Sequence, residues 1–89
     1  MSTARVARSV ARHRARLTRV LAHIDAHLDR PLSLATLADV AECSPFHFHR
    51  LFAAGVGVTV HRYVQLARLE RAAARLAFRA EQRVTAIAL

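Results

Sequence analysis

The segment 33–52 constrains the fold of this chain more than any other, because it contains two helix starts close together. Ser33 precedes a run of helix-forming residues, and Ser44 is followed directly by Pro45. A serine side chain at a helix N-terminus accepts a bond from a backbone N–H, and proline suits the first helical position. The few residues between the two helices leave room only for a tight turn. The segment therefore predicts two short helices joined by a turn, the second over residues 45–54.

Each short helix has one apolar face, which we expect to be buried. In the first helix this face consists of Leu34, Leu37, Ala38 and Ala41. In the second helix it consists of Phe48, Leu51 and Phe52. The opposite side of the second helix carries Phe46, Arg50 and Ala53, with His47 and His49 on its flanks. The second helix thus has one side for a core and one side that is free to contact a partner.

A longer amphipathic helix precedes this segment. At about 100° per residue, its apolar face comprises Val6, Val10, Leu17, Val20, Leu21, Ile24 and Leu28, interrupted by His13. The other side carries a stripe of arginines: Arg5, Arg8, Arg12, Arg16 and Arg19. The helix begins either close to the N-terminus or only near Arg14. It ends before Pro31, because the residue preceding a proline avoids the helical backbone conformation.

A second long helix is expected after the two short ones. Gly57 suits a left-handed cap on the preceding helix, and Thr59 caps the new one, which should run to about Ala77. One apolar face consists of Val60, Tyr63, Val64 and Ala67, and a nearly opposite one of Leu66, Leu69, Ala73 and Leu76. A helix with two apolar faces needs two packing partners. After the polar residues 79–82, a further helix is expected to begin at Arg83.

The composition favours an all-α fold. Nineteen of the 89 residues are alanine, the strongest helix former, against 2 glycines and 2 prolines. A chain of this length makes one small domain. The formal charge is +8, and all 14 basic side chains are arginines. This excess favours a polyanionic partner, either nucleic acid or an acidic membrane surface; a GC-rich genome would explain arginine in place of lysine, but not the excess.

Several other classes of protein are not expected. The single cysteine, Cys43, excludes an internal disulfide and a cysteine-based zinc site and fits a reducing compartment. No apolar run approaches the roughly 18 residues of a membrane span, so we expect a cytoplasmic protein, although the acid-free N-terminus also resembles a mitochondrial transit peptide. His23 and His27 have the spacing of paired metal ligands but lack a third ligand. We therefore expect no metal, no cofactor, no membrane partner and no enzymatic activity.

With these features in view, the sequence resembles the DNA-binding domain of the AraC/XylS family of transcription regulators, from about Leu17 to Leu89. That family carries two helix-turn-helix units joined by a long helix. In the first unit the matching positions are Ile24, Leu28, Pro31-Leu32-Ser33-Leu34, Leu37-Ala38, Ser44 and Leu51-Phe52. Beyond it they are Gly57, Thr59, Tyr63, Arg68-Leu69, Ala72, Leu76, Val84-Thr85 and Ile87-Ala88. The run 44–52 is similar to a subgroup that usually carries a further C-terminal effector-binding domain.

The resemblance divides the chain into a basic arm or helix extension (1–16), a first helix-turn-helix unit (17–57), a linker helix (58–79) and the truncated start of a second unit (80–89). Because the second recognition helix is absent, we expect a fragment, a truncated gene product or a natural half-domain. Glu42 stands at a turn position where the family usually has glycine, and a left-handed backbone there would cost roughly 1 kcal/mol. Leu66 and Ala67 stand where relatives commonly have basic residues.

The expected function is sequence-specific binding of double-stranded DNA by a transcription regulator, with the helix 45–54 in the major groove. The expected base contacts are Phe46, His49 and Arg50, because an arginine can bridge guanine O6 and N7 and an apolar ring can meet thymine methyl groups. The expected phosphate contacts are Ser44, His47, Arg8 and Arg12.

Alternatives remain open at this stage. The simpler interpretations are that Phe46 packs against the first helix, that His49 is solvated, and that Arg50 is solvated or bound to phosphate. The arginine stripe of the first helix would then only face water. The whole chain is alternatively a basic amphipathic interaction or membrane-surface module, or a remnant that binds nothing. The second face of the linker helix also predicts self-association through Leu66, Leu69, Ala73 and Leu76.

Overall fold

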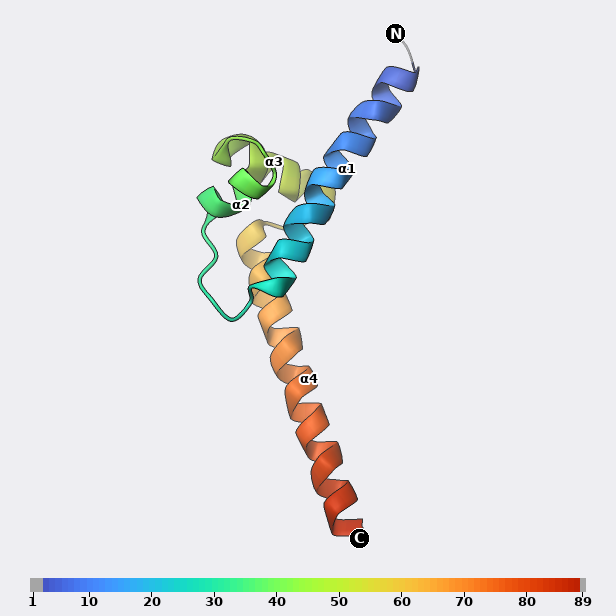
Figure 1. The fold of residues 1–89 in the computed structure, drawn as a ribbon, viewed down its shortest axis with the longest axis vertical. Helices are drawn as coiled ribbons and strands as arrows, with labels where there is room; N and C mark the ends of the chain where they lie inside the picture. The colour runs from blue at the N-terminus through green and yellow to red at the C-terminus, as the bar shows by residue number, and fades with distance from the viewer. Residues whose placement is uncertain (1–2, 89) are drawn as a thin grey trace.

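The computed structural model describes the backbone of residues 3–88 and the side chains of residues 3–83. Within that part the chain forms four α-helices and no strand: α1 (Thr3–Ala26), α2 (Leu34–Val40), α3 (Pro45–Val56) and α4 (Val60–Ala88) (Figure 1). The predicted all-α fold is confirmed.

Three hydroxyl side chains start the helices where the sequence predicts them. The Oγ of Ser33 accepts a hydrogen bond from the backbone N–H of Thr36 at 3.1 Å, and α2 begins at the next residue. The Oγ of Ser44 accepts from His47 N at 3.2 Å, before α3. The Oγ1 of Thr59 accepts from Arg62 N at 3.2 Å, before α4. Each hydroxyl satisfies a backbone donor that the first turn of a helix leaves without an intrahelical partner.

Two left-handed residues end α2 and α3. Gly57 has φ 92° and closes α3 with a bond from its N–H to Ala53 O at 3.0 Å, as predicted. Glu42 has φ 59° in the turn between α2 and α3, and it is the non-glycine residue with positive φ in the described part of the chain. This is the left-handed conformation considered above for a position where the family usually has glycine. The turn that sets the angle between the two short helices therefore contains a strained residue.

The core lies where α1, α2, α3 and the start of α4 meet. Its largest fully buried side chains are Val20, Ile24, Leu37, Phe48 and Phe52. Val60 and Val64 of α4 close it, with Tyr63 and Leu17 among the side chains packed around it. The rings of Phe48 and Phe52 meet edge to face at 5.8 Å between centroids. The predicted core positions of both phenylalanines are thus confirmed, and they hold α3 on the core by its inner side.

Three residues differ in burial from what the sequence predicts. Leu34 is 40% exposed because it lies at the first position of α2, beyond the edge of the core. Leu51 is only half buried. Ala53, expected on the outer side of α3, is half buried instead.

The molecule is elongated because its two long helices extend past the core in opposite directions (Figure 1). Its extents are 67 × 28 × 17 Å, and its radius of gyration is 18.0 Å, against about 12 Å for a compact chain of this length. Val6 and Val10 lie toward the projecting end of α1 and are more than half exposed, although Val10 lines a pocket together with Leu51 and Ala54 of α3. The apolar face of α1 is therefore covered around Val20 and Ile24 but largely exposed toward its N-terminal end.

The helix α4 runs without a break to Ala88, whereas the sequence predicts an end near Ala77 and a new helix from Arg83. The polar residues 79–82 were interpreted as a connection, yet Arg, Ala, Glu and Gln are all strong helix formers. Without a glycine or proline nothing in this stretch stops the helix. The assignment of residues 80–89 to a second helix-turn-helix unit stays a prediction, and the side chains of residues 84–89 lie outside the described part.

Candidate nucleic-acid interface

The outer side of α3 presents the three predicted base-contacting residues together. Phe46, His49 and Arg50 are all exposed, and Phe46 is 73% exposed. The guanidinium carbon of Arg50 lies 5.7 Å from the centre of the Phe46 ring, which is the distance of a cation–π contact. Phe46 therefore does not pack against α1. It forms, with Arg50, a flat and positively charged surface on the side of α3 that faces away from the core.

The predicted phosphate-contacting residues fall into two separate groups. Ser44 and His47 are exposed at the N-terminal end of α3, joined by the capping bond. Arg8 and Arg12 are exposed on the projecting part of α1. The structure does not bring the two groups together, because α1 meets the other end of α3, where Gly55 packs against Leu17.

A groove opens beside α3, between the start of α2 and the start of α4. Its volume is about 510 Å³. Its apolar lining comes from Pro31, Leu32, Leu34, Val60 and Val64. Its polar lining comes from His49, Thr59, His61 and Arg68. The groove and the outer side of α3 therefore share one residue, His49, and no acidic side chain lines the groove.

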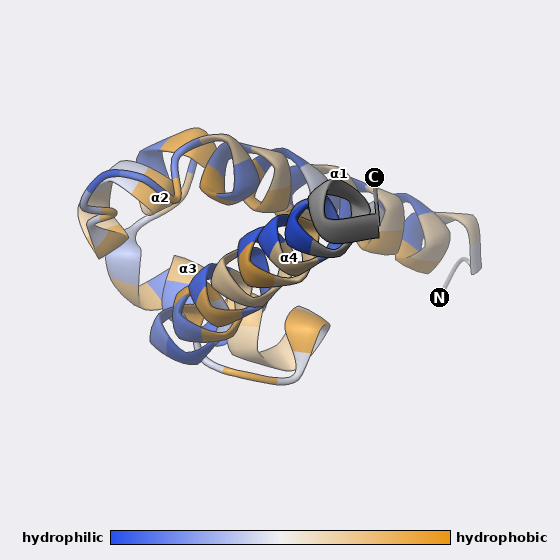
Figure 2. Ribbon diagram, turned by 90° about the horizontal axis from the view of Figure 1, so that it is seen from below, coloured by the Kyte–Doolittle hydropathy of each residue, from blue (hydrophilic) through white to orange (hydrophobic). Residues whose placement is uncertain are grey.

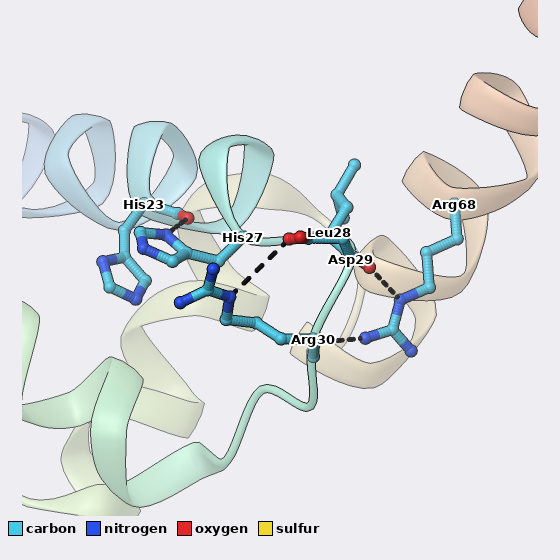
Figure 3. A network of polar contacts seen from close by, with 6 residues as sticks. All are labelled: His23, His27, Leu28, Asp29, Arg30 and Arg68. Carbon is cyan, nitrogen blue, oxygen red and sulfur yellow. Dashed lines mark hydrogen bonds and ion pairs between the residues drawn. The ribbon is translucent and has the colours of Figure 1, made fainter.

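Arg68 fixes the position of α4 against the first three helices (Figure 3). Its Nε donates to the backbone oxygen of Leu28 at 3.2 Å, and its Nη2 donates to that of Arg30 at 3.0 Å. The guanidinium thus binds two carbonyl groups of the loop between α1 and α2. This role of Arg68 was not predictable from the sequence, because Arg68 and its acceptors are 38 and 40 positions apart and no local pattern links them.

Tyr63 also holds α4 against the other helices, because its side chain packs against the core. Its ring meets that of Phe52 edge to face, with 5.7 Å between centroids. Burial raises the pKa of Tyr63 above its ordinary value. The carboxylate of Asp25, which accepts a hydrogen bond from the Tyr63 hydroxyl, and that of Glu70 raise the pKa further.

The two histidines and the cysteine noted in the sequence contribute to the structure of the chain. His23 and His27 stack with 4.1 Å between ring centroids, and Nδ1 of His27 lies 2.7 Å from His23 O (Figure 3). Cys43 is half buried in the turn and packs against the core. Among the described residues, no group of three or more His, Cys, Asp or Glu side chains is placed to hold a metal ion. None of the helices in this part combines the length and the apolar composition that a bilayer crossing requires.

Two short helices joined by a tight turn, with the second held on a shared core and exposed on its outer side, define the helix-turn-helix class. A family model described as helix-turn-helix domain matches residues 37–89. The chain belongs to this family, the AraC-type helix-turn-helix domains of transcription regulators, so the resemblance noted in the sequence is confirmed.

Two curated relatives come from Bacillus subtilis (strain 168). Over 66 residues, the chain is 41% identical to the uncharacterized HTH-type transcriptional regulator YbfP, a match that covers 74% of this chain and 22% of that protein. Over 50 residues, it is 38% identical to the bifunctional transcriptional activator/DNA repair enzyme AdaA, with 56% and 24% covered. The chain spans about a quarter of the length of these relatives or less. The family and both names support DNA-binding transcription regulation for this chain.

Proposed function

We propose that this chain binds double-stranded DNA sequence-specifically, with α3 seated in the major groove. The observation that carries the proposal is the two-sided character of α3. Phe48 and Phe52 are fully buried on its inner side, while Phe46 and Arg50 are exposed on its outer side in a cation–π contact. A helix fixed from behind in this way can place side chains against base edges with little loss of conformational entropy on binding.

Each exposed residue has a defined part in this proposal. Arg50 reads a guanine through O6 and N7, Phe46 meets thymine methyl groups, and His49 donates to a base edge. The Ser44 oxygen accepts the capping bond, so its own O–H remains available for a phosphate oxygen, and His47 stands beside it. Arg8 and Arg12 lie too far along α1 to share the contacts of α3, so we assign them a general attraction for the DNA backbone.

A mobility-shift assay with duplex DNA in rising salt tests the proposal. We expect non-specific binding with a Kd of about 10⁻⁴–10⁻⁶ M at physiological salt, falling steeply as salt increases. Selection from a randomised duplex pool should then yield a preferred site. Binding that is independent of salt, or no binding to any duplex at low salt, would contradict the proposal.

Two arginine variants test whether base recognition and general attraction to the DNA backbone belong to different residues. Arg50→Ala should weaken binding at the preferred site by about 1–3 kcal/mol and relax the sequence preference. Arg8→Ala should weaken binding to all sequences equally and lower the salt dependence. If Arg8→Ala alters the sequence preference while Arg50→Ala does not, the assignment is wrong.

The projecting part of α1 favours a second candidate function, adsorption to an anionic membrane surface. Val6 and Val10 are exposed there on a helix whose other side carries arginines, the pattern of an interfacial helix. Vesicles with and without anionic lipid, followed by co-sedimentation of the chain, test this candidate. Val6→Glu should abolish adsorption if α1 inserts, whereas Leu69→Glu on the distant α4 should not.

A further inference from the structure

We propose that the groove between α3 and the start of α4 binds the sugar-phosphate backbone next to the base pairs that α3 reads, with His61 as its phosphate contact. The inference rests on the proposed function. It assigns a binding role to a surface of α4 that lies outside the helix-turn-helix itself.

The charge of the groove favours a polyanion. His49 and His61 line its two sides, on α3 and α4 respectively, and Arg68 lines it as well. Arg68 donates to two backbone carbonyl groups, which orient the guanidinium but do not neutralise its charge. The segments that complete the groove contribute Pro31, Leu32 and Leu34 and no charge. Every ionisable group that lines the groove is therefore basic.

The groove lies next to the surface of α3 that faces the bases, and this position favours DNA over other polyanions. His49 belongs both to the groove and to the outer surface of α3, so the groove continues the surface that faces the bases. When a helix occupies the major groove, the two sugar-phosphate strands pass along its sides. A strand passing on the α4 side of α3 would meet His61. Leu34, which is 40% exposed, offers an apolar surface to the deoxyribose rings.

The test compares His61→Ala with the unchanged chain on a duplex carrying the preferred site. Fluorescence anisotropy is measured from about 50 to 200 mM salt at pH 6, where imidazoles carry charge, and at pH 8, where most do not. At pH 6 we expect His61→Ala to lower the slope of log K against log salt by about one unit, equally on specific and non-specific DNA. At pH 8 the two proteins should differ little.

Two further variants sharpen the comparison. His61→Arg keeps its charge at pH 8 and should there raise the salt slope by about one unit above that of the unchanged chain. Arg75→Ala is the matched control, because it removes a full charge from the same helix about 21 Å away, beyond the screening length of physiological salt. It should leave the slope unchanged. Any pH dependence that arises elsewhere in the chain is common to all four proteins and cancels.

A neutral methylphosphonate placed at single phosphates beside the site identifies the contact directly. At one position it should weaken the unchanged chain at pH 6 by at least several-fold and have little effect on His61→Ala. If no position behaves in this way and His61→Ala keeps the full slope, the groove does not contact the backbone, although DNA binding by α3 stands. If the unchanged chain binds no duplex, both this inference and the proposed function are overturned.

Discussion

Glu42 occupies a left-handed backbone conformation that penalises every residue with a Cβ atom by about 1–2 kcal/mol. Its carboxylate lies 3.7 Å from Arg19, but both side chains are mostly exposed, so this ion pair contributes little. We expect Glu42→Gly to raise the free energy of unfolding by about 0.5–1 kcal/mol and Tm by roughly 2–8 °C.

The control for Glu42→Gly is Glu42→Ala, which loses the same ion pair but keeps the strain. Thermal unfolding followed by circular dichroism measures both variants. Glycine should be the more stable of the two, and equal stability would show that the conformation carries no strain.

Tyr63 links stability to alkaline pH. Because its pKa is raised in the folded protein, the unfolded chain ionises first as pH increases. The stabilisation is therefore complete below the ordinary tyrosine pKa of about 10 and is lost as pH rises through the folded value. We expect the free energy of unfolding in urea to fall as the pH rises above about 10, and to fall less in Tyr63→Phe. An identical pH profile in the two proteins would exclude Tyr63 as the cause.

At the scale of elements, Arg68 holds α4 to the loop between α1 and α2. Arg68→Met keeps most of the apolar stem but removes two charge-assisted hydrogen bonds, so we expect a loss of about 1–2 kcal/mol after allowing for the exposure of the site. Arg68→Lys should restore only part of it, because an ammonium group cannot reproduce the geometry of the guanidinium. Arg79→Met, on the distant part of α4, should cost little. Urea unfolding measures all three, and equal losses for Arg68→Met and Arg79→Met would contradict the assignment.

Elements whose signals are local were predictable from the sequence. The side chains of Ser33, Ser44 and Thr59 each accept a hydrogen bond from a backbone N–H within one helical turn, and Gly57 caps the helix that precedes it. The starts of α2, α3 and α4 and the end of α3 therefore follow from local residues. The exposed side of α3 follows from the buried positions of Phe48 and Phe52. What depends on distant contacts was not predictable. The Arg68 bonds, the groove at His61 and the exposure of Val6 require knowing which helices meet, and polarity alone was a poor guide to the end of α4.

At the scale of the whole molecule, the uncovered part of α4 is its most conspicuous surface. Orange hydrophobic segments recur between blue ones along α4 (Figure 2). The first predicted face, around Val60 and Val64, covers the core, whereas the second is exposed, with Leu69 at 67% and Leu76 at 65%. We expect this face to drive concentration-dependent self-association, because water disfavours a continuous apolar stripe.

Sedimentation velocity across a concentration series tests the self-association. Leu69→Glu should keep the chain monomeric without unfolding the core, since Leu69 contributes little to it. Ala74→Glu adds the same charge to the same helix at an exposed position about 120° from the centre of the stripe, and it should leave association unchanged. An unchanged chain that stays monomeric at high concentration would contradict the expectation.

Because α4 is uninterrupted, its number of residues sets both the direction in which its far end faces and the distance of that end from the core. Each helical residue turns the chain by about 100° and advances it by only about 1.5 Å. One alanine inserted after Leu76 would therefore swing everything beyond it to a different side of the molecule while scarcely moving it outward. Seven inserted residues would restore the direction to within about 20° and displace it by about 10 Å. For any longer protein that carries this helix, angular phase rather than reach would decide what the far end of α4 faces.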